Sequence, residues 1–190
     1  MPEKGKVNLL SDAIKTVSQL LREDDVEGVI IGGLAASLLG RPRYTDDIDL
    51  LILNLDEHLP EFIEKLERFG IYPRINDAEG FAKDSRVLLM RHESTGINID
   101  ISMGILPFEN EAVSRRLIKR ALDTDIFLPT PEDLIIMKSI SERSKDLEDI
   151  KAIIIRNSEL DKKRILRTVR EFADALENED IYNRIKGLLN

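Results

Sequence analysis

The chain has 190 residues, with 28 basic and 36 acidic side chains and a formal net charge of −8. No apolar run approaches the roughly 18 residues that a membrane span needs, and the start of the chain lacks the apolar segment of a secretion signal. The absence of cysteine excludes disulfides. We therefore expect a soluble, cytoplasmic protein without a membrane anchor, and composition excludes disulfide-stapled secreted domains.

The first part of the chain alternates between helix and strand patterns. Apolar residues at helical spacing predict helices, and short β-branched runs predict strands. Helices are expected over residues 8–22, 34–39 and 60–69, and strands over residues 28–31, 47–53, 87–92, 97–103 and 126–128. Residues 93–96 are expected to form the loop of a hairpin.

From Thr130 the pattern becomes helical almost to the last residue. Thr130 is a typical N-cap, Pro131 suits the first helical position, and Glu132 and Asp133 place acids in the first turn. We therefore predict an α/β (α+β) body over residues 1–128 and an α-helical domain over residues 129–190. A mixed sheet is expected in the body.

Three aspartates are the candidate site residues with the clearest chemistry. Asp47 and Asp49 are separated by one residue in a strand pattern, so their side chains point to the same face. Asp100 lies on the polar face of the strand over 97–103, together with Asn98 and Ser102. Carboxylates held close together need a cation between them, and Mg²⁺ prefers oxygen ligands. The alternative is a strand end with solvated acids.

Gly32-Gly33 lies between the first strand pattern and a helix pattern. Glycines at such a turn let the backbone approach a phosphate closely. The segment is neither a Walker loop, because no Gly-Lys-Ser/Thr follows, nor the dinucleotide pattern G-x-G-x-x-G. A tight turn without a ligand is the alternative interpretation.

Together, Gly32-Gly33 and Arg43-x-Thr45-x-Asp47-Ile48-Asp49 resemble the first motif of the DNA-polymerase-β-type nucleotidyltransferase superfamily. The likeness is greatest to the AbiEii-type toxins of abortive-infection systems. The segments 132–138 and 143–150 are similar to that group's later Lys and Asp motifs. The resemblance implies a mixed-sheet catalytic core followed by a helical part.

The resemblance also implies roles for particular residues. Asp47 and Asp49 would bind Mg²⁺, with two ions expected, and Asp100 would be the third ligand or the catalytic base. Gly32, Gly33, Arg43, Thr45 and Lys138 would bind the nucleotide, and Asp146 belongs to the later motif. Many members have Ser where this chain has Gly33, and Ser37 is a weak substitute. Alternatively, Lys138 is an ordinary surface lysine, and Asp146 and Asp149 pair with Arg143 and Lys151 on one helix face.

The function expected from these residues is Mg²⁺-dependent transfer of a nucleoside monophosphate from an NTP, such as ATP, to an acceptor hydroxyl. The resemblance to AbiEii-type proteins implies the toxin of a toxin–antitoxin pair, with an RNA 3′ end or a protein side chain as acceptor and an antitoxin protein as partner. A basic cluster, Arg115-Arg116 with Lys119-Arg120, is expected on a helix, where it either guides RNA or is a solvated face. The alternative function is a non-catalytic nucleotide-binding or regulatory module with the same fold.

Overall fold

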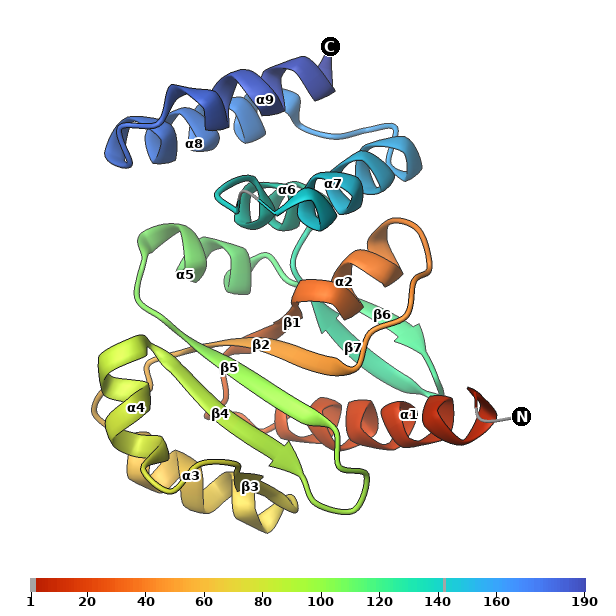
Figure 1. The fold of residues 1–190 in the computed structure, drawn as a ribbon, viewed down its shortest axis with the longest axis vertical. Helices are drawn as coiled ribbons and strands as arrows, with labels where there is room; N and C mark the ends of the chain where they lie inside the picture. The colour runs from red at the N-terminus through yellow and green to blue at the C-terminus, as the bar shows by residue number, and fades with distance from the viewer. Residues whose placement is uncertain (1–2, 142) are drawn as a thin grey trace. The chain divides into compact units, whose positions relative to one another are not determined.

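The computed structural model describes residues 3–141 and 143–190 (Figure 1). By its internal contacts the chain forms two compact units. Unit 1 contains Met1–Leu34 and Thr45–Leu128, and unit 2 contains Ala35–Tyr44 and Pro129–Asn190. Within the described part of the chain, no helix is both long and apolar enough to cross a membrane.

Unit 1 is built from strands with helices between them, as Figure 1 shows. Its strands are β1 (Gly28–Ile31), β2 (Asp47–Leu53), β3 (Ile71–Pro73), β4 (Val87–His92), β5 (Asn98–Gly104), β6 (Leu117–Ala121) and β7 (Thr124–Leu128). Its helices are α1 (Glu3–Leu20), α3 (Leu59–Arg68), α4 (Ala78–Ser85) and α5 (Pro107–Ser114), and α2 (Gly32–Leu39) begins in this unit. The expected mixture of helices and strands is confirmed.

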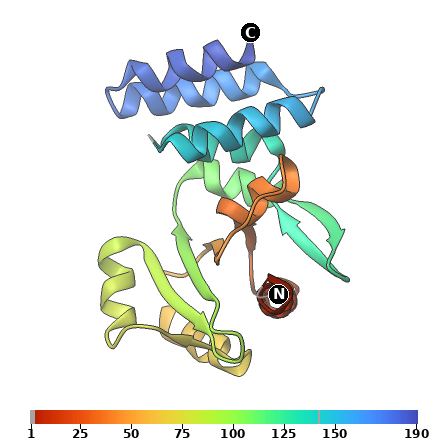
Figure 2. The same cartoon turned by 45° about the vertical axis from the view of Figure 1, so that its right-hand side comes forward.

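Five strands form one mixed sheet in the order β1-β2-β5-β4-β3. Strands β2 and β5 are parallel, whereas the other neighbours in this sheet are antiparallel. Strands β6 and β7 form a separate antiparallel pair, which Figure 2 shows beside the larger sheet. The mixed sheet predicted from the sequence is therefore present, and its central pair is the parallel one.

The two faces of the five-stranded sheet differ sharply in composition. One face is apolar and fully buried in its central strands, where six side chains have no exposed surface: Ile48, Leu50, Leu88, Met90, Ile99 and Ile101. Each such side chain contributes roughly 1.5–3 kcal/mol through the hydrophobic effect. The opposite face is polar and at least partly exposed at Asp47, Asp49, Asn98, Asp100 and Ser102, whereas Leu51 and Leu53 farther along β2 are buried. We call this the open face, and it carries the predicted acidic residues.

Several sequence-based expectations for unit 1 need correction. The basic cluster at 115–120 does not lie on a helix, because α5 ends at Ser114 and Leu117–Ala121 is strand β6. Leu117 and Ile118 pair with Leu128 and Phe127 of β7 in a hairpin closed by Leu122 and Asp123, and this pairing overrides the helical pattern. Helix α2 begins at Gly32, two residues earlier than expected. The short elements β3, α4 and α5 were not predicted.

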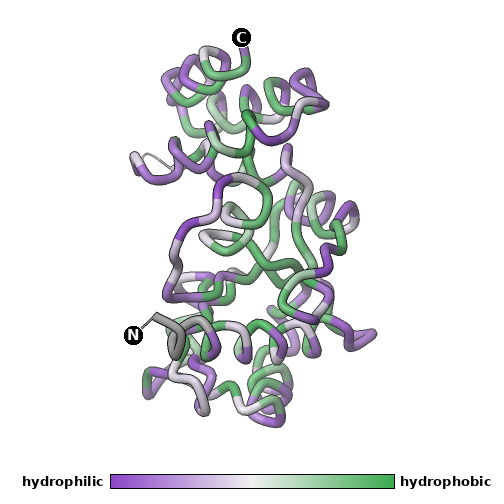
Figure 3. The backbone as a smooth tube through the Cα atoms, turned by 90° about the vertical axis from the view of Figure 1, so that its right-hand side faces the viewer, coloured by the Kyte–Doolittle hydropathy of each residue, from purple (hydrophilic) through white to green (hydrophobic). Residues whose placement is uncertain are grey.

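Unit 2 is helical, as expected for residues 129–190. Its helices are α6 (Pro131–Ser139), α7 (Ser144–Arg156), α8 (Lys162–Ala175) and α9 (Glu179–Leu189). The predicted N-cap is confirmed, since the Thr130 side chain accepts a hydrogen bond from the Asp133 amide. Hydrophobic and hydrophilic residues alternate along these helices (Figure 3), and their apolar sides supply the core of the unit.

The structure places one segment differently from the division predicted at residues 128 and 129. Residues 35–44, from α2 and the loop after it, group with unit 2. Arg156 donates a hydrogen bond to the carbonyl of Gly40 (2.9 Å), and Asn157 donates one to the carbonyl of Leu39 (2.9 Å). A Cβ on Gly40 would lie 3.1 Å from the Ile153 amide, so α7 packs directly on this backbone. Such contacts between distant segments leave no local signal in the sequence.

Candidate active site

The three predicted carboxylates lie on the open face of the sheet in unit 1. In the parallel pairing of β2 and β5, Asp49 is directly opposite Asp100, and Asp47 is opposite Asn98. Neighbouring strands are about 4.8 Å apart, so the side chains of paired residues on one face are close. The structure therefore brings Asp47, Asp49 and Asp100 together on adjacent strands.

Gly32, at the junction of β1 and α2, lies directly beside one of these carboxylates. Its φ angle is +62°, a left-handed conformation that favours glycine, and a Cβ at this position would lie 1.7 Å from Oδ2 of Asp49. No side chain fits there while Asp49 keeps its position. The glycine thus allows the backbone at the start of α2 to lie directly against the Asp49 carboxylate.

We predict that Gly32→Ala displaces Asp49 and lowers transferase activity by about 100-fold, because a misplacement of about 1 Å at a reacting centre has effects of that size. Gly70→Ala is the matched control. Gly70 has a similar φ of +70°, but nothing lies within 4 Å of the position that a Cβ would take there, so this variant reports backbone strain alone, roughly 1–2 kcal/mol. Equal loss of activity in both variants would contradict the importance of the contact between Gly32 and Asp49.

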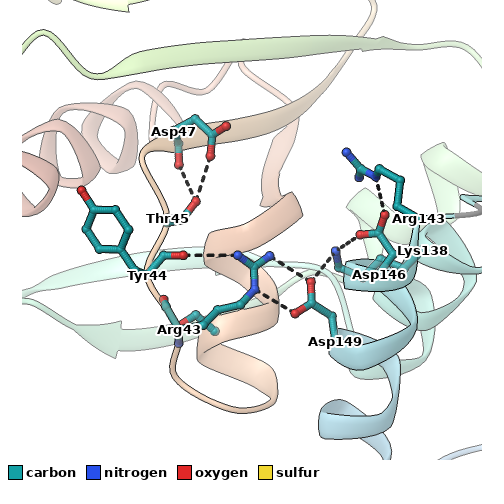
Figure 4. A network of polar contacts seen from close by, with 9 residues as sticks. Arg43, Tyr44, Thr45, Asp47, Lys138, Arg143, Asp146 and Asp149 are labelled. Atoms are coloured by element: carbon teal, nitrogen blue, oxygen red, sulfur yellow. Dashed lines mark hydrogen bonds and ion pairs between the residues drawn. The ribbon is translucent and has the colours of Figure 1, made fainter.

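Thr45 orients the first of the three carboxylates. Its side-chain hydroxyl lies 2.8 Å from Oδ1 of Asp47 and donates a hydrogen bond to it. Thr45 is nearly buried, with 8% of its surface exposed, whereas Asp47 is exposed. This contact fixes one oxygen of Asp47, as Figure 4 shows. The predicted contact of Thr45 with a triphosphate stays a prediction.

Asp100 is held by an arginine that the sequence analysis did not single out. Nη2 of Arg74 lies 2.6 Å from Oδ1 of Asp100. Burial raises the pKa of the Asp100 carboxyl, the Arg74 guanidinium opposes this rise, and the negative charge of Asp47 adds to it; the net pKa is raised. The influence of Asp47 on this pKa is the like-charge repulsion expected of carboxylates that share a site.

The chemistry of these side chains fits a magnesium site. Three carboxylates on one partly exposed face offer the hard oxygen ligands that Mg²⁺ prefers. Among residues 3–141 and 143–190, no group of three or more His, Cys, Asp or Glu side chains is already arranged to hold a metal ion. Asp47 and Asp100 are instead held by Thr45 and Arg74.

Unit 2 contains a separate cluster of charged side chains, drawn in Figure 4. Arg43 binds Asp149 through two parallel hydrogen bonds, of 2.8 and 2.9 Å. Nζ of Lys138 lies 2.6 Å from Asp146 and 2.9 Å from Asp149. Arg143 completes the cluster at 2.6 Å from Asp146. We call these five residues the α6–α7 ion cluster.

The α6–α7 ion cluster is largely buried, so its charges depend on one another. The side chains of Lys138 and Asp149 are 7% exposed, and that of Asp146 is 3% exposed. Burial raises the pKa of Asp149, but hydrogen bonds from Arg43 and Lys138 outweigh it and the pKa is lowered. The alternative interpretation of Asp146 is confirmed in its pairing with Arg143, while Lys138 is a buried lysine rather than a surface one. Its phosphate contact, and that of Arg43, stay predictions.

The stability that the α6–α7 ion cluster contributes depends on pH through Asp146. Burial raises its pKa, but hydrogen bonds from Lys138, Ser141 and Arg143 lower it more, to about 2 from an ordinary 3.8. A carboxyl with a lowered pKa in the folded state stabilises the protein fully above about pH 4. That stabilisation, about 2 kcal/mol, is lost as the pH falls towards 2.

We therefore predict that the free energy of unfolding of Asp146→Asn falls less between pH 4 and pH 2 than that of the wild type. Urea unfolding followed by circular dichroism, in wild type and variant, measures this difference. Asp180→Asn, at an exposed position in α9, is expected to follow the wild-type curve. An Asp146→Asn curve parallel to that of the wild type would contradict the assignment.

The predicted site residues thus fall into two groups. Gly32, Gly33, Thr45, Asp47, Asp49 and Asp100 belong to unit 1, whereas Arg43, Lys138 and Asp146 belong to unit 2. Ser37, the weak substitute for a phosphate-binding serine, bonds the backbone of Arg43 through its hydroxyl. Arg74 was missed because its contact with Asp100 requires the strand order β3-β4-β5, and no motif in the sequence marks it.

Comparison with solved structures identifies the fold. ANT(2'')-Ia in complex with adenylyl-2''-tobramycin is 15% identical, with a TM-score of 0.55, and the match covers 90% of this chain and 99% of that chain. The lincosamide antibiotic adenylyltransferase LnuA, bound to lincomycin, is 19% identical, with a TM-score of 0.52, and the match covers 82% of this chain and 98% of that chain. An antigenic nucleotidyltransferase-like protein from Paracoccidioides brasiliensis is 15% identical, with a TM-score of 0.50, and the match covers 95% of this chain and 94% of that chain. No curated protein matches the chain.

The mixed sheet and these likenesses define the nucleotidyltransferase fold. A sequence profile of a family described as "nucleotidyltransferase of unknown function (DUF6036)" matches residues 8–186, so the chain belongs to that family. It is accordingly a nucleotidyltransferase, as the resemblance of its first motif implies. The likeness to AbiEii-type toxins in particular stays a prediction.

Proposed function

We propose that this protein transfers a nucleoside monophosphate from an NTP to an acceptor hydroxyl in a Mg²⁺-dependent reaction at the open face of unit 1. The observation that carries the proposal is the placement of Asp47, Asp49 and Asp100 on adjacent parallel strands. Family membership supports nucleotidyl transfer in general. The adenylyl group bound to ANT(2'')-Ia supports ATP as the donor.

In this proposal Asp47 and Asp49 hold Mg²⁺, two ions being the expected number, and Asp100 is a third ligand or the base. The bound ions supply charge neutralisation for the phosphates and a more acidic acceptor hydroxyl. The acceptor oxygen forms a bond to the α-phosphorus while the bond from that phosphorus to the β-phosphate oxygen breaks, and pyrophosphate leaves. When Asp100 is the base, it takes the hydroxyl proton. The protein's contribution is positioning and electrostatics, since phosphoryl transfer requires little covalent chemistry from it.

The residues proposed to contact the nucleotide are Gly32 and Gly33 at the start of α2, with Thr45, Arg43 and Lys138. Backbone amides at a helix start are suited to phosphate. For Arg43 and Lys138 to bind phosphate they would exchange carboxylate partners in the α6–α7 ion cluster for the ligand. Calorimetry of ATP binding to Lys138→Met tests this: weaker binding supports the contact, and unchanged affinity excludes it.

The acceptor proposed is an RNA 3′ end or a protein side chain, as for AbiEii-type toxins with an antitoxin partner. The antibiotic ligands of the solved relatives make a small-molecule hydroxyl the other class to test.

The test is transfer of label from [α-³²P]ATP and the other labelled NTPs, with Mg²⁺, to bulk tRNA, to the protein itself and to a panel of aminoglycosides and lincosamides. Labelled RNA or protein supports the proposal. Label on the antibiotics alone would confirm transfer and overturn the macromolecular acceptor. Nucleotide binding without any labelled product would favour the alternative, a non-catalytic module. Growth arrest on expression, relieved by Asp47→Ala, would support the toxin role.

A further inference from the structure

Arg74 reaches the open face from the edge of the sheet. It follows β3 directly, and its backbone amide donates a hydrogen bond to the carbonyl of Leu89 on β4 (3.1 Å). Leu89 is the strand partner of Asp100 on β5. The backbone of Arg74 is thereby fixed beside β4, and its side chain extends to the next strand, where it meets Asp100.

The ion pair between Arg74 and Asp100 is short and partly shielded. Nη2 and Oδ1 are 2.6 Å apart, and the two side chains are 23% and 31% exposed. Such a charge-assisted hydrogen bond is stronger than one between neutral groups. Nε of Arg74 is buried and has no hydrogen-bond partner among the described residues. Asp100 is therefore the main anchor of this guanidinium.

The pair also has a consequence for the charge of the open face. Asp47, Asp49 and Asp100 place three negative charges on adjacent strands, which repel one another without a cation. Arg74 supplies one positive charge at the third carboxylate. The positive charge of Arg74 would repel a metal ion bound to these carboxylates. Arg74 therefore lowers the affinity of the three carboxylates for a cation.

We propose that Arg74 is a positioning residue of the transferase site. It holds Asp100 through Oδ1, directs the second carboxylate oxygen to the reacting groups, and limits the affinity of the open face for divalent cations. This inference rests on the proposed function, since it assigns Asp100 to the reaction. It adds a residue from the end of β3 to a site otherwise built on β2 and β5.

The test compares Arg74→Gln, which keeps hydrogen-bond donors without the charge, with Arg74→Lys, which keeps the charge without the planar fork. Arg91→Gln is the matched control. Arg91 is exposed and on the same face, and its Nε donates to the Asn98 amide oxygen (3.1 Å) rather than to a carboxylate. Mn²⁺ affinity is measured by electron paramagnetic resonance, and turnover with saturating NTP is measured on the same preparations.

Arg74→Gln is expected to bind Mn²⁺ about 3- to 10-fold more tightly, because a competing positive charge is removed. Its turnover is expected to fall about 10- to 100-fold, because supporting groups around ligands have effects of that size. Arg74→Lys is expected to keep the wild-type Mn²⁺ affinity and to recover only part of the turnover. Arg91→Gln is expected to stay within about twofold of wild type in both measurements, as surface changes usually have small effects.

Unchanged or weaker Mn²⁺ binding in Arg74→Gln would overturn the inference, because a purely structural residue does not tighten metal binding when it is replaced. So would full turnover in that variant. Failure of the proposed function looks different: wild-type protein would itself transfer no label and bind no Mn²⁺ that depends on Asp47 and Asp49. A wild type that transfers label beside an unaffected Arg74→Gln would refute only the role of Arg74.

Discussion

Replacing both Asp47 and Asp49 by alanine is expected to abolish nucleotidyl transfer, with a loss of at least about a thousandfold, because the carboxylates proposed to hold the metal are removed. The fold is expected to persist with equal or higher stability, since two like charges leave the open face. Transfer of label from [α-³²P]NTP measures the first effect, and urea unfolding measures the second.

Asp46→Ala is the matched control for this double variant. Asp46 is an exposed aspartate next to Asp47 but lies outside strand β2. Its replacement removes the same chemical group from the same segment, and activity is expected to stay within about twofold of wild type. Retained transfer in Asp47→Ala/Asp49→Ala, or equal loss in Asp46→Ala, would refute the metal-binding role.

Replacing Asp149 by alanine is expected to destabilise unit 2 by about 3 kcal/mol, because it leaves Arg43 and Lys138 without a shared buried carboxylate. The bidentate contact with Arg43 ties the segment 35–44 to α7, so its loss is also expected to make that segment more accessible. Urea unfolding gives the stability change. Hydrogen exchange of residues 35–44 measures the change in the accessibility of that segment.

Glu148→Ala provides the control for this experiment, because Glu148 is an exposed acid on the same helix, one residue before Asp149. Its effect is expected to be within about 0.5 kcal/mol. Equal stabilities of the two variants would show that the α6–α7 ion cluster does not hold this segment in place.

The part of the site that the sequence predicted well follows from local periodicity. Asp47 and Asp49 are two residues apart in an apolar run, and Asp100 alternates with Ile99 and Ile101, so the strand period alone assigns all three to polar faces. That the two polar faces coincide depends on the pairing of β2 with β5. The resemblance to the nucleotidyltransferase superfamily implied that Asp100 completes the group, and the register places Asp100 opposite Asp49.

The features that were not predicted depend on contacts between distant segments. Arg74 meets Asp100 only because β4 lies between β3 and β5, and Arg43 meets Asp149 across more than a hundred residues of sequence. The error at residues 115–120 has a different origin, since β6 and β7 form a local hairpin through a turn at Leu122 and Asp123 that was not recognised in the sequence. Local propensity is a weak guide where such pairing decides the structure.

The most direct test of the central claim is a crystal structure of the protein with Mn²⁺ and a non-hydrolysable ATP analogue, in which anomalous scattering locates the metal. The account predicts metal in contact with the carboxylates of Asp47 and Asp49, at about the 2.0–2.2 Å expected for such hard ligands, with the analogue's phosphates bound to the same ions and Asp100 facing them. Metal and nucleotide bound away from the open face, with Asp47 and Asp49 in contact with neither, would contradict it.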